Sequence, residues 1–141
     1  MKHFRWRYLL VLLLLPALSG CVRVVAHVLD VDPGQSGVEI TMNAKVPMPD
    51  GTNLAIDIYQ PKGNGPFPAV LTILPYGTDA RMFTGIGKLF ARNGYVFLAE
   101  DCRGTENSEG KWFPLVWDWD DGHETLAWIE KQPWFDGNLG M

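Results

Sequence analysis

A carboxylate and a guanidinium two residues apart, Asp101 and Arg103, are the first side chains in this chain whose types and placement suggest chemistry. They follow a short apolar run without alternation, Tyr95 to Ala99, which is typical of a strand buried on both faces. Reacting groups and ligands collect just beyond the carboxyl ends of such strands. The two side chains could act on a ligand directly. We favour an architectural role, in which they pair with neighbouring residues, or with the region from Asp118 to Asp121, and pin the following loop.

No side chain in the sequence has the setting of a catalytic nucleophile. The three serines, at positions 19, 36 and 108, all lie outside a Gly-x-Ser-x-Gly frame. Cys102 has no neighbouring His to lower the pKa of its thiol, so we interpret it as packed rather than reactive. His123 could serve as a base, but on the inward stripe of a helix a structural His is the favoured interpretation.

The sequence predicts no metal, no cofactor and no nucleic-acid partner. The histidines have no metal-ligand spacing, and Asp118, Asp120 and Asp121 are explained by the dipole at the start of a helix. The first 20 residues hold three of the 12 Lys and Arg residues and none of the 16 Asp and Glu residues, so the remainder has a net charge of −7. An acidic chain offers no basic patch for phosphates.

The elements that must position these side chains begin with a predicted β-hairpin. Val38 to Val46 and Leu54 to Tyr59 alternate apolar and polar residues on either side of a turn at Asp50-Gly51. The further predicted elements are a buried strand at Ala69–Leu74, a helix at Phe83–Asn93, the strand that ends at Asp101, a helix at Asp118–Lys131, and the start of a strand at Asn138–Met141. This order predicts an α/β fold, an antiparallel β-hairpin followed by a parallel βαβα arrangement, with an incomplete sheet.

The second predicted helix carries one stripe that we expect to face the sheet. Its members recur at helical spacing and are Trp119, Gly122, His123, Leu126 and Ile129.

Residues 1–20 have the composition of an export signal. Three basic residues precede an apolar stretch, Tyr8 to Leu18, that is shorter than the roughly 20 residues of a spanning helix. Leu18-Ser19-Gly20-Cys21 resembles the lipobox of bacterial lipoproteins, which implies a lipid anchor on Cys21; an ordinary cleaved signal or an uncleaved anchor are the alternatives. We expect an exported, membrane-anchored lipoprotein that faces the periplasm or cell exterior, with residues 21–37 as a tether that has little to pack.

Short motifs follow one another in a fixed order from about residue 38 to the end of the sequence. They are Asp50-Gly51-Thr52, Asp57-x-Tyr59-x-Pro61, Gly65-Pro66-Phe67-Pro68, Pro75-Tyr76-Gly77, Asp101-x-Arg103-Gly104, Ser108-x-Gly110, Gln132-Pro133-Trp134 and Gly137-x-Leu139-Gly140-Met141. Each is weak alone. Their order and spacing together resemble the N-terminal part of the X-prolyl dipeptidyl peptidase and cocaine esterase (CocE/NonD) family of α/β-hydrolases.

The resemblance implies a serine hydrolase that cleaves a small-molecule ester, amide or peptide through an acyl-enzyme. In that family the Gly-Met segment leads into a Gly-x-Ser-Tyr-x-Gly elbow, whereas this sequence ends at Met141. We therefore expect residues 38–141 to be an N-terminal fragment of a catalytic domain that lacks the Ser, the acid and the His and is inactive alone. Tyr76 matches the family's Pro-Tyr motif, whose hydroxyl helps to bind the oxyanion; a Tyr packed at a strand end is the alternative.

A short non-catalytic lipoprotein remnant with a binding or scaffolding role is the alternative function. A sheet without its central strand would leave Ala69–Leu74 or Tyr95–Ala99 as an unpaired apolar edge, which invites aggregation and counts against a stable remnant. The sequence leaves the identity of the substrate and the oligomeric state open.

Overall fold

The structure, a computed structural model, describes residues 27, 32, 34–77 and 81–141. Its elements are β1 (Val38–Pro47), β2 (Asn53–Pro61), β3 (Phe67–Leu74), α3 (Arg81–Arg92), β4 (Val96–Asp101), α4 (Asp118–Ile129) and β5 (Phe135–Gly140). Each strand and helix predicted after residue 37 is present, with bounds shifted by a few residues. The predicted signal, Cys21 and most of the predicted tether lie outside the described residues. Within the described part of the chain, none of the helices has the length and apolar character that a bilayer span requires.

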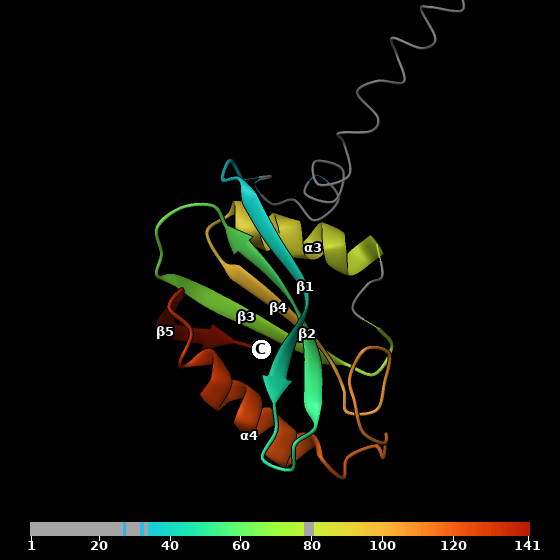
Figure 1. The fold of residues 1–141 in the computed structure, drawn as a ribbon. Coiled ribbons are helices and arrows are strands. Elements are labelled where there is room, and N and C mark those ends of the chain that lie inside the picture. The colour runs from blue at the N-terminus through green and yellow to red at the C-terminus, as the bar shows by residue number, and fades with distance from the viewer. Residues whose placement is uncertain (1–26, 28–31, 33, 78–80) are drawn as a thin grey trace, which may run out of the picture.

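The strands form one sheet in the order β1-β2-β4-β3-β5 (Figure 1). β1 and β2 form the predicted antiparallel hairpin, β2 pairs antiparallel with β4, and β3 pairs parallel with both β4 and β5. The predicted α/β arrangement is thus confirmed. The expectation of an apolar edge at β3 or β4 is wrong, because β5 begins at Phe135, earlier than predicted, and occupies the place beside β3.

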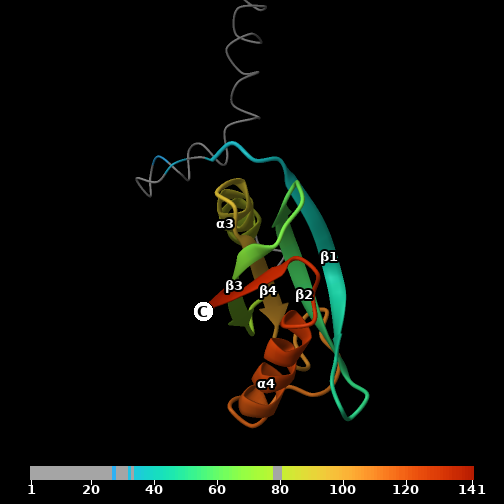
Figure 2. The ribbon, with the colours of Figure 1, turned by 90° about the vertical axis from the view of Figure 1, so that its left-hand side faces the viewer.

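The two helices cover opposite faces of the sheet. Neighbouring residues of β4, such as Phe97 and Leu98, belong to different core clusters because successive strand side chains point to opposite faces. The cluster that includes Ile129 of α4 contains Val46, Met48, Leu54, Ile56, Ile58, Ala69, Leu71, Val96, Leu98 and Trp134. The cluster on the α3 side contains Tyr59, Ala91, Phe97 and Ala99, with Phe83, Ile86 and Phe90 packed against it. Figure 2 shows the two helices well apart along the sheet.

The chain just before β1 is docked on the C-terminal end of α3. Arg92 Nη2 donates to the carbonyl of Gly34 at 2.9 Å, Asn93 Nδ2 donates to the carbonyl of Asp32 at 2.9 Å, and the N–H of Ser36 donates to the carbonyl of Arg92 at 3.3 Å. Gly34 has a φ of +66°, and a Cβ there would lie 2.4 Å from the Arg92 carbonyl oxygen. The expectation that this part of the tether packs little is therefore wrong at Asp32 and from residue 34 onward.

Candidate functional site

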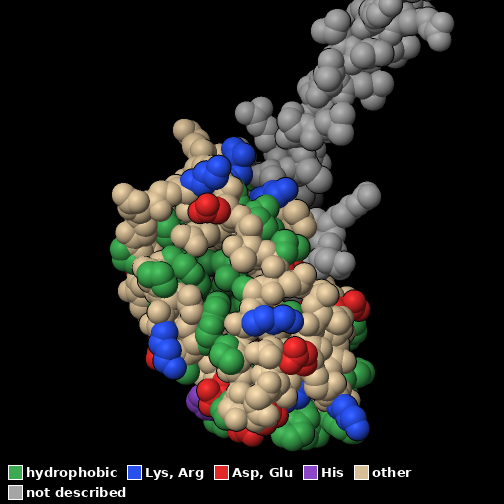
Figure 3. All heavy atoms as spheres, viewed as in Figure 1, with side chains coloured by type: hydrophobic (Ala, Val, Ile, Leu, Met, Phe, Trp, Pro, Cys, Tyr) green, Lys and Arg blue, Asp and Glu red, His purple; other side chains and the backbone are tan. Residues whose placement is uncertain are grey.

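The carboxyl ends of β3, β4 and β5 meet at one edge of the sheet because the three strands are parallel. A hollow of about 500 Å³ opens there. It is lined by Leu54, Ile73, Pro75, Tyr76, Glu100, Cys102, Arg103, Trp112, Pro114, Leu115, Asp118, Asp121, Gly122 and Met141. In Figure 3, exposed apolar side chains lie beside acidic ones at the lower end of the molecule, where α4 lies in Figure 1. The edge thus combines an apolar surface with a cluster of carboxylates.

Tyr76 lies just beyond β3, at the mouth of this hollow. Its side chain is 84% exposed, so it is not packed against the end of the strand. Met141, the residue directly after β5, lines the same hollow. The phenol hydroxyl is therefore available to a ligand that approaches the ends of β3 and β5.

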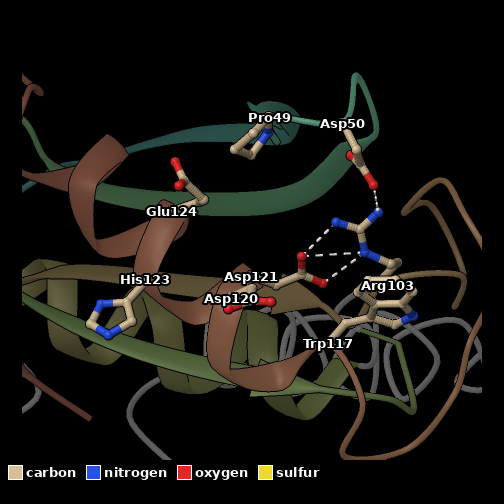
Figure 4. A pocket seen from close by; sticks show the side chains of 8 residues that line it. All are labelled: Pro49, Asp50, Arg103, Trp117, Asp120, Asp121, His123 and Glu124. Atoms are coloured by element: carbon tan, nitrogen blue, oxygen red, sulfur yellow. Dashed lines mark hydrogen bonds and ion pairs between the residues drawn. The ribbon is translucent and has the colours of Figure 1, made fainter.

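Arg103 is buried and is the centre of a polar network that extends from the buried Asp121 to the exposed Asp50 (Figure 4). Its Nε donates to Asp121 Oδ2 at 2.9 Å and its Nη2 donates to Asp121 Oδ1, which makes a bidentate pair. Its Nη1 donates to Asp50 Oδ2 at 2.7 Å and to Thr52 Oγ1 at 2.8 Å, and its guanidinium carbon lies 5.1 Å from the centre of the Trp117 ring. The pairing of Arg103 with the Asp118–Asp121 region, one of the arrangements expected from the sequence, is present.

The network ties three segments that are distant in sequence. Asp50 and Thr52 belong to the β1–β2 turn, Arg103 follows β4, and Asp121 lies in the first turn of α4. The hydrogen bonds that Arg103 donates to Asp121 and then to Asp50 raise the pKa of Arg103 above its usual value. Hydrogen bonds from the Thr52 N–H and hydroxyl, followed by Arg103, lower the pKa of Asp50. Arg103 and Asp121 line this hollow and also a second one of about 300 Å³, which Asp50 and Glu124 line as well.

Asp101 is completely buried and contacts the loop that follows it. Its Oδ2 accepts from the N–H of Asn107 at 3.3 Å. Ser108 Oγ donates to the Asp101 carbonyl at 2.6 Å and accepts from the N–H of Ala55 at 2.8 Å. Gly104 is part of the same compact turn, since a Cβ there would lie 2.2 Å from the backbone nitrogen of Trp112. Asp101 and Ser108 thus join β2, β4 and the loop, and neither residue lines the hollow.

Glu100 is the polar residue of this edge that the sequence reasoning missed. It is 1% exposed on β4 and accepts a hydrogen bond from Thr125 Oγ1 of α4 at 2.8 Å. Burial raises the pKa of Glu100 to about 8; the Thr125 hydroxyl opposes this shift, and Asp121 and Asp101 add to it. An acidic residue at the end of an otherwise apolar strand was the signal that could have identified it.

The inward stripe predicted for α4 is wrong at two of its members. Trp119 is 76% exposed and His123 is exposed, with the two rings stacked edge to face at 4.8 Å between centres. The buried residues of α4 are Asp121, Thr125 and Ile129. Because Arg103 and Glu100 offer partners below the helix, two polar side chains replace the expected aromatic ones. His123 is therefore not a buried structural His.

Cys102 lies half-buried in the hollow. Burial, with the surrounding carboxylates of Asp118, Glu100 and Asp101, raises the pKa of its thiol to about 11. The thiol is protonated at neutral pH, in line with the predicted packed role. In the part of the chain that the structure describes, no three His, Cys, Asp or Glu side chains are grouped closely enough to hold a metal ion.

Comparisons with known proteins match both the motifs and the fold. The X-Pro dipeptidyl-peptidase (S15) family matches residues 50–141. Cocaine esterase from Rhodococcus sp. (strain MB1 Bresler) is 39% identical over 110 residues, which are 72% of this chain and 18% of that protein. Among solved structures, a CocE/NonD family hydrolase from Staphylococcus aureus has a TM-score of 0.65 at 27% identity, over 72% of this chain and 22% of that one. An α-amino acid ester hydrolase has a TM-score of 0.64 at 26% identity, over 75% and 21%. The chain spans about a fifth of the length of these relatives.

Proposed function

The chain belongs to the X-Pro dipeptidyl-peptidase (S15) family of hydrolases, and from that premise we propose that residues 38–141 are the N-terminal part of the catalytic domain of a serine hydrolase. The observation that carries this proposal is the shared hollow: Tyr76 after β3 and Met141 after β5 line one cavity at the carboxyl ends of parallel strands. That edge is where an α/β sheet places its reacting groups.

In the proposed reaction, a Ser on the turn after β5 attacks the carbonyl of an ester or amide, and its proton passes through the base to the alcohol or amine that departs. Water then hydrolyses the acyl-enzyme, which releases the carboxylic acid and restores the Ser. The Tyr76 hydroxyl donates to the oxyanion as it develops, together with a backbone N–H. The Ser, its base and the acid that orients the base lie beyond residue 141 in this proposal, since the sequence contains no Gly-x-Ser-x-Gly frame. Residues 1–141 by themselves are expected not to hydrolyse esters.

The proposed substrate is a small ester, amide or peptide. A hollow of about 500 Å³ falls within the size range of small-molecule sites, and the exposed Leu115 beside Trp112 supplies apolar contact for an acyl or leaving group. The names of the relatives, a cocaine esterase and an α-amino acid ester hydrolase, describe small esters as their substrates. No cofactor or metal is part of the proposed mechanism.

The test is Tyr76→Phe in the hydrolase whose reading frame continues through the elbow. Loss of one oxyanion donor should lower kcat about 10²- to 10³-fold, with the free energy of unfolding unchanged because Tyr76 is exposed. Tyr95→Phe is the matched control: it replaces an exposed Tyr just before β4, at the opposite end of the strand from the hollow, and should leave kcat unchanged. Equal kcat values for the Tyr76 variant and the wild type would overturn the role.

We also propose that the protein is exported and held to a membrane by a lipid on Cys21, with residues 1–20 as the removed signal and residues 21–37 as the lipidated tether. The docked residues Gly34 to Gly37 enter the domain at the C-terminal end of α3, near the start of β4 and opposite the hollow. Metabolic labelling with a radioactive fatty acid should mark the wild type and not Cys21→Ala. Label that persists in the variant would exclude this anchor.

A further inference from the structure

Glu100 occupies a place where an ionised carboxylate has little to stabilise it. On β4 its Cα partners are Ile56 of β2 and Ile73 of β3, so both neighbouring strands present apolar residues. From α4, the hydroxyl of Thr125 contacts its carboxyl group. Ion pairs to Glu100 from Lys, Arg or His are absent among the residues that the structure describes.

The charges around Glu100 are mostly negative. The titratable and charged groups that border it or line the same hollow are Asp101 and Cys102 after it on the chain, Arg103 in the following loop, Asp118 and Asp121 on α4, and Tyr76 beyond β3. Arg103 is the single cation among them, and its guanidinium is bonded to Asp121 and Asp50. The neighbours that raise the pKa of Glu100 after burial itself are Asp121 and Asp101.

Two buried polar contacts seat α4 on the sheet at this edge, Asp121 with Arg103 and Thr125 with Glu100. Asp118, Asp121 and Gly122 of the same helix form a wall of the hollow. A negative charge on Glu100 would place a further carboxylate beside Asp101 and Asp121, where the Glu100 side chain has little contact with solvent. The repulsion would be relieved only if α4 moved outward or if water entered beside it.

We propose that Glu100 is a positioning residue, which must keep its proton for α4 to hold its place as a wall of the hollow. With its proton, the carboxyl group is a neutral hydrogen-bond partner of Thr125. The helix is then attached to the sheet without a buried charge in addition to the Asp121–Arg103 ion pair. The inference rests on the proposed function only in treating the hollow as the substrate site. The protonation and the helix position are properties of the chain itself.

The first readout is the pH dependence of stability, measured by urea unfolding of the full chain. The unfolded carboxyl titrates near 4.5 and the folded one near 8, so the folded state binds more protons between these values and stability falls as pH rises through that window. The folded-to-unfolded ratio should fall by up to about tenfold per pH unit. Glu100→Gln keeps the shape and removes the charge, and its stability should lack this fall.

The second readout measures whether α4 changes its position with pH. If Glu100 had only a structural role, the helix would keep the same position at every pH. Methyl groups of Leu126 and Ile129 on α4 are followed by NMR from pH 6 to 9, with Ile86 and Leu89 of α3 as matched controls. The α4 methyl shifts should titrate with a midpoint near 8 in the wild type and stay constant in Glu100→Gln, while the α3 methyls stay constant in both.

The carboxyl carbon of Glu100, observed by ¹³C NMR in the wild type, makes the test independent of how well any variant folds. A carboxyl that titrates below pH 6 would overturn the proposal, and so would α4 methyls that stay constant through its titration. An unchanged kcat in Tyr76→Phe, by contrast, would overturn the proposed oxyanion role and leave the Glu100 result standing, because neither NMR readout uses activity.

Discussion

The two helices of this domain are attached to the sheet by different means. α3 packs through apolar contact: Phe83, Ile86 and Phe90 lie against the cluster around Tyr59, and the ring of Phe90 stacks on Phe97 at 5.3 Å. α4 buries two polar residues and one apolar residue, with Asp121 paired to Arg103 and Thr125 bonded to Glu100. The helix far from the hollow is attached through apolar packing, whereas the helix that lines it adds directed polar bonds to the apolar contacts of Leu126, Trp128 and Ile129.

The difference shows what each kind of contact can specify. Apolar packing is non-directional and supplies most of the stabilisation of a small domain. A buried ion pair adds little net stability, but its geometry fixes one orientation, and removal of either partner is costly. α4 needs a defined orientation because its first turn forms a wall of the hollow.

The largest expected effect on the free energy of unfolding comes from removing Arg103, the centre of the polar network that attaches α4 to the sheet. Arg103→Ala leaves the carboxylate of Asp121 buried without its cation, and the free energy of unfolding should fall by about 3–5 kcal/mol in urea denaturation. Arg92→Ala at the end of α3 is the control: it removes a hydrogen bond to Gly34 and should cost about 1 kcal/mol. A similar loss of unfolding free energy in the two variants would mean that the two helices are attached to the sheet in the same way.

An intermediate effect, of opposite sign on the two helices, comes from adding one methyl group. Gly87→Ala on α3 places a Cβ 2.6 Å from the ring of Tyr59, and overpacking should lower the free energy of unfolding by about 1–3 kcal/mol. Gly122→Ala on α4 meets nothing within 4 Å and should raise it by about 0.5–1 kcal/mol through helix propensity. Thermal or urea unfolding of both variants checks the pair. Destabilisation by the Gly122 variant would show that this face of α4 is closely packed.

The smallest effect is expected on the outward face of α4. Trp119 is exposed, so Trp119→Ala should change the free energy of unfolding by no more than about 0.5 kcal/mol. A Trp on the buried face would cost about 3–5 kcal/mol, so the same urea titration separates the two orientations of the helix clearly. A large loss would restore the inward stripe that the sequence predicts.

The contrast between the helices also explains which predictions held. On α3 the apolar residues that recur at helical spacing, such as Phe83 and Ile86, do pack against the sheet. On α4 the same rule selected Trp119 and His123, because it counts apolar side chains and gives no weight to Asp121 or Thr125. A polar residue of α4 faces inward only where another part of the chain supplies a hydrogen-bond partner. For Asp121 and Thr125 these partners are Arg103, in the loop after β4, and Glu100, on β4.

The polar network was foreseen only in part. The strand-end position of Arg103 and the acidic first turn of the following helix suggested their pairing. The contribution of Asp50 and Thr52 from the hairpin turn was not foreseen, and neither was Glu100. Nothing local to the hairpin indicates that its turn lies beside α4.

The amino-acid sequence by itself determines the order of strands and helices after residue 37 and the family, because alternation, buried apolar runs and turn motifs are local in the chain. Only the tertiary structure decides that β5 fills the place beside β3, that α4 turns Asp121 and Thr125 inward, and that Glu100 lies beneath it. The physical reason is that burial of a polar group depends on a partner brought from elsewhere in the chain, and that partner is defined only when the sheet has formed.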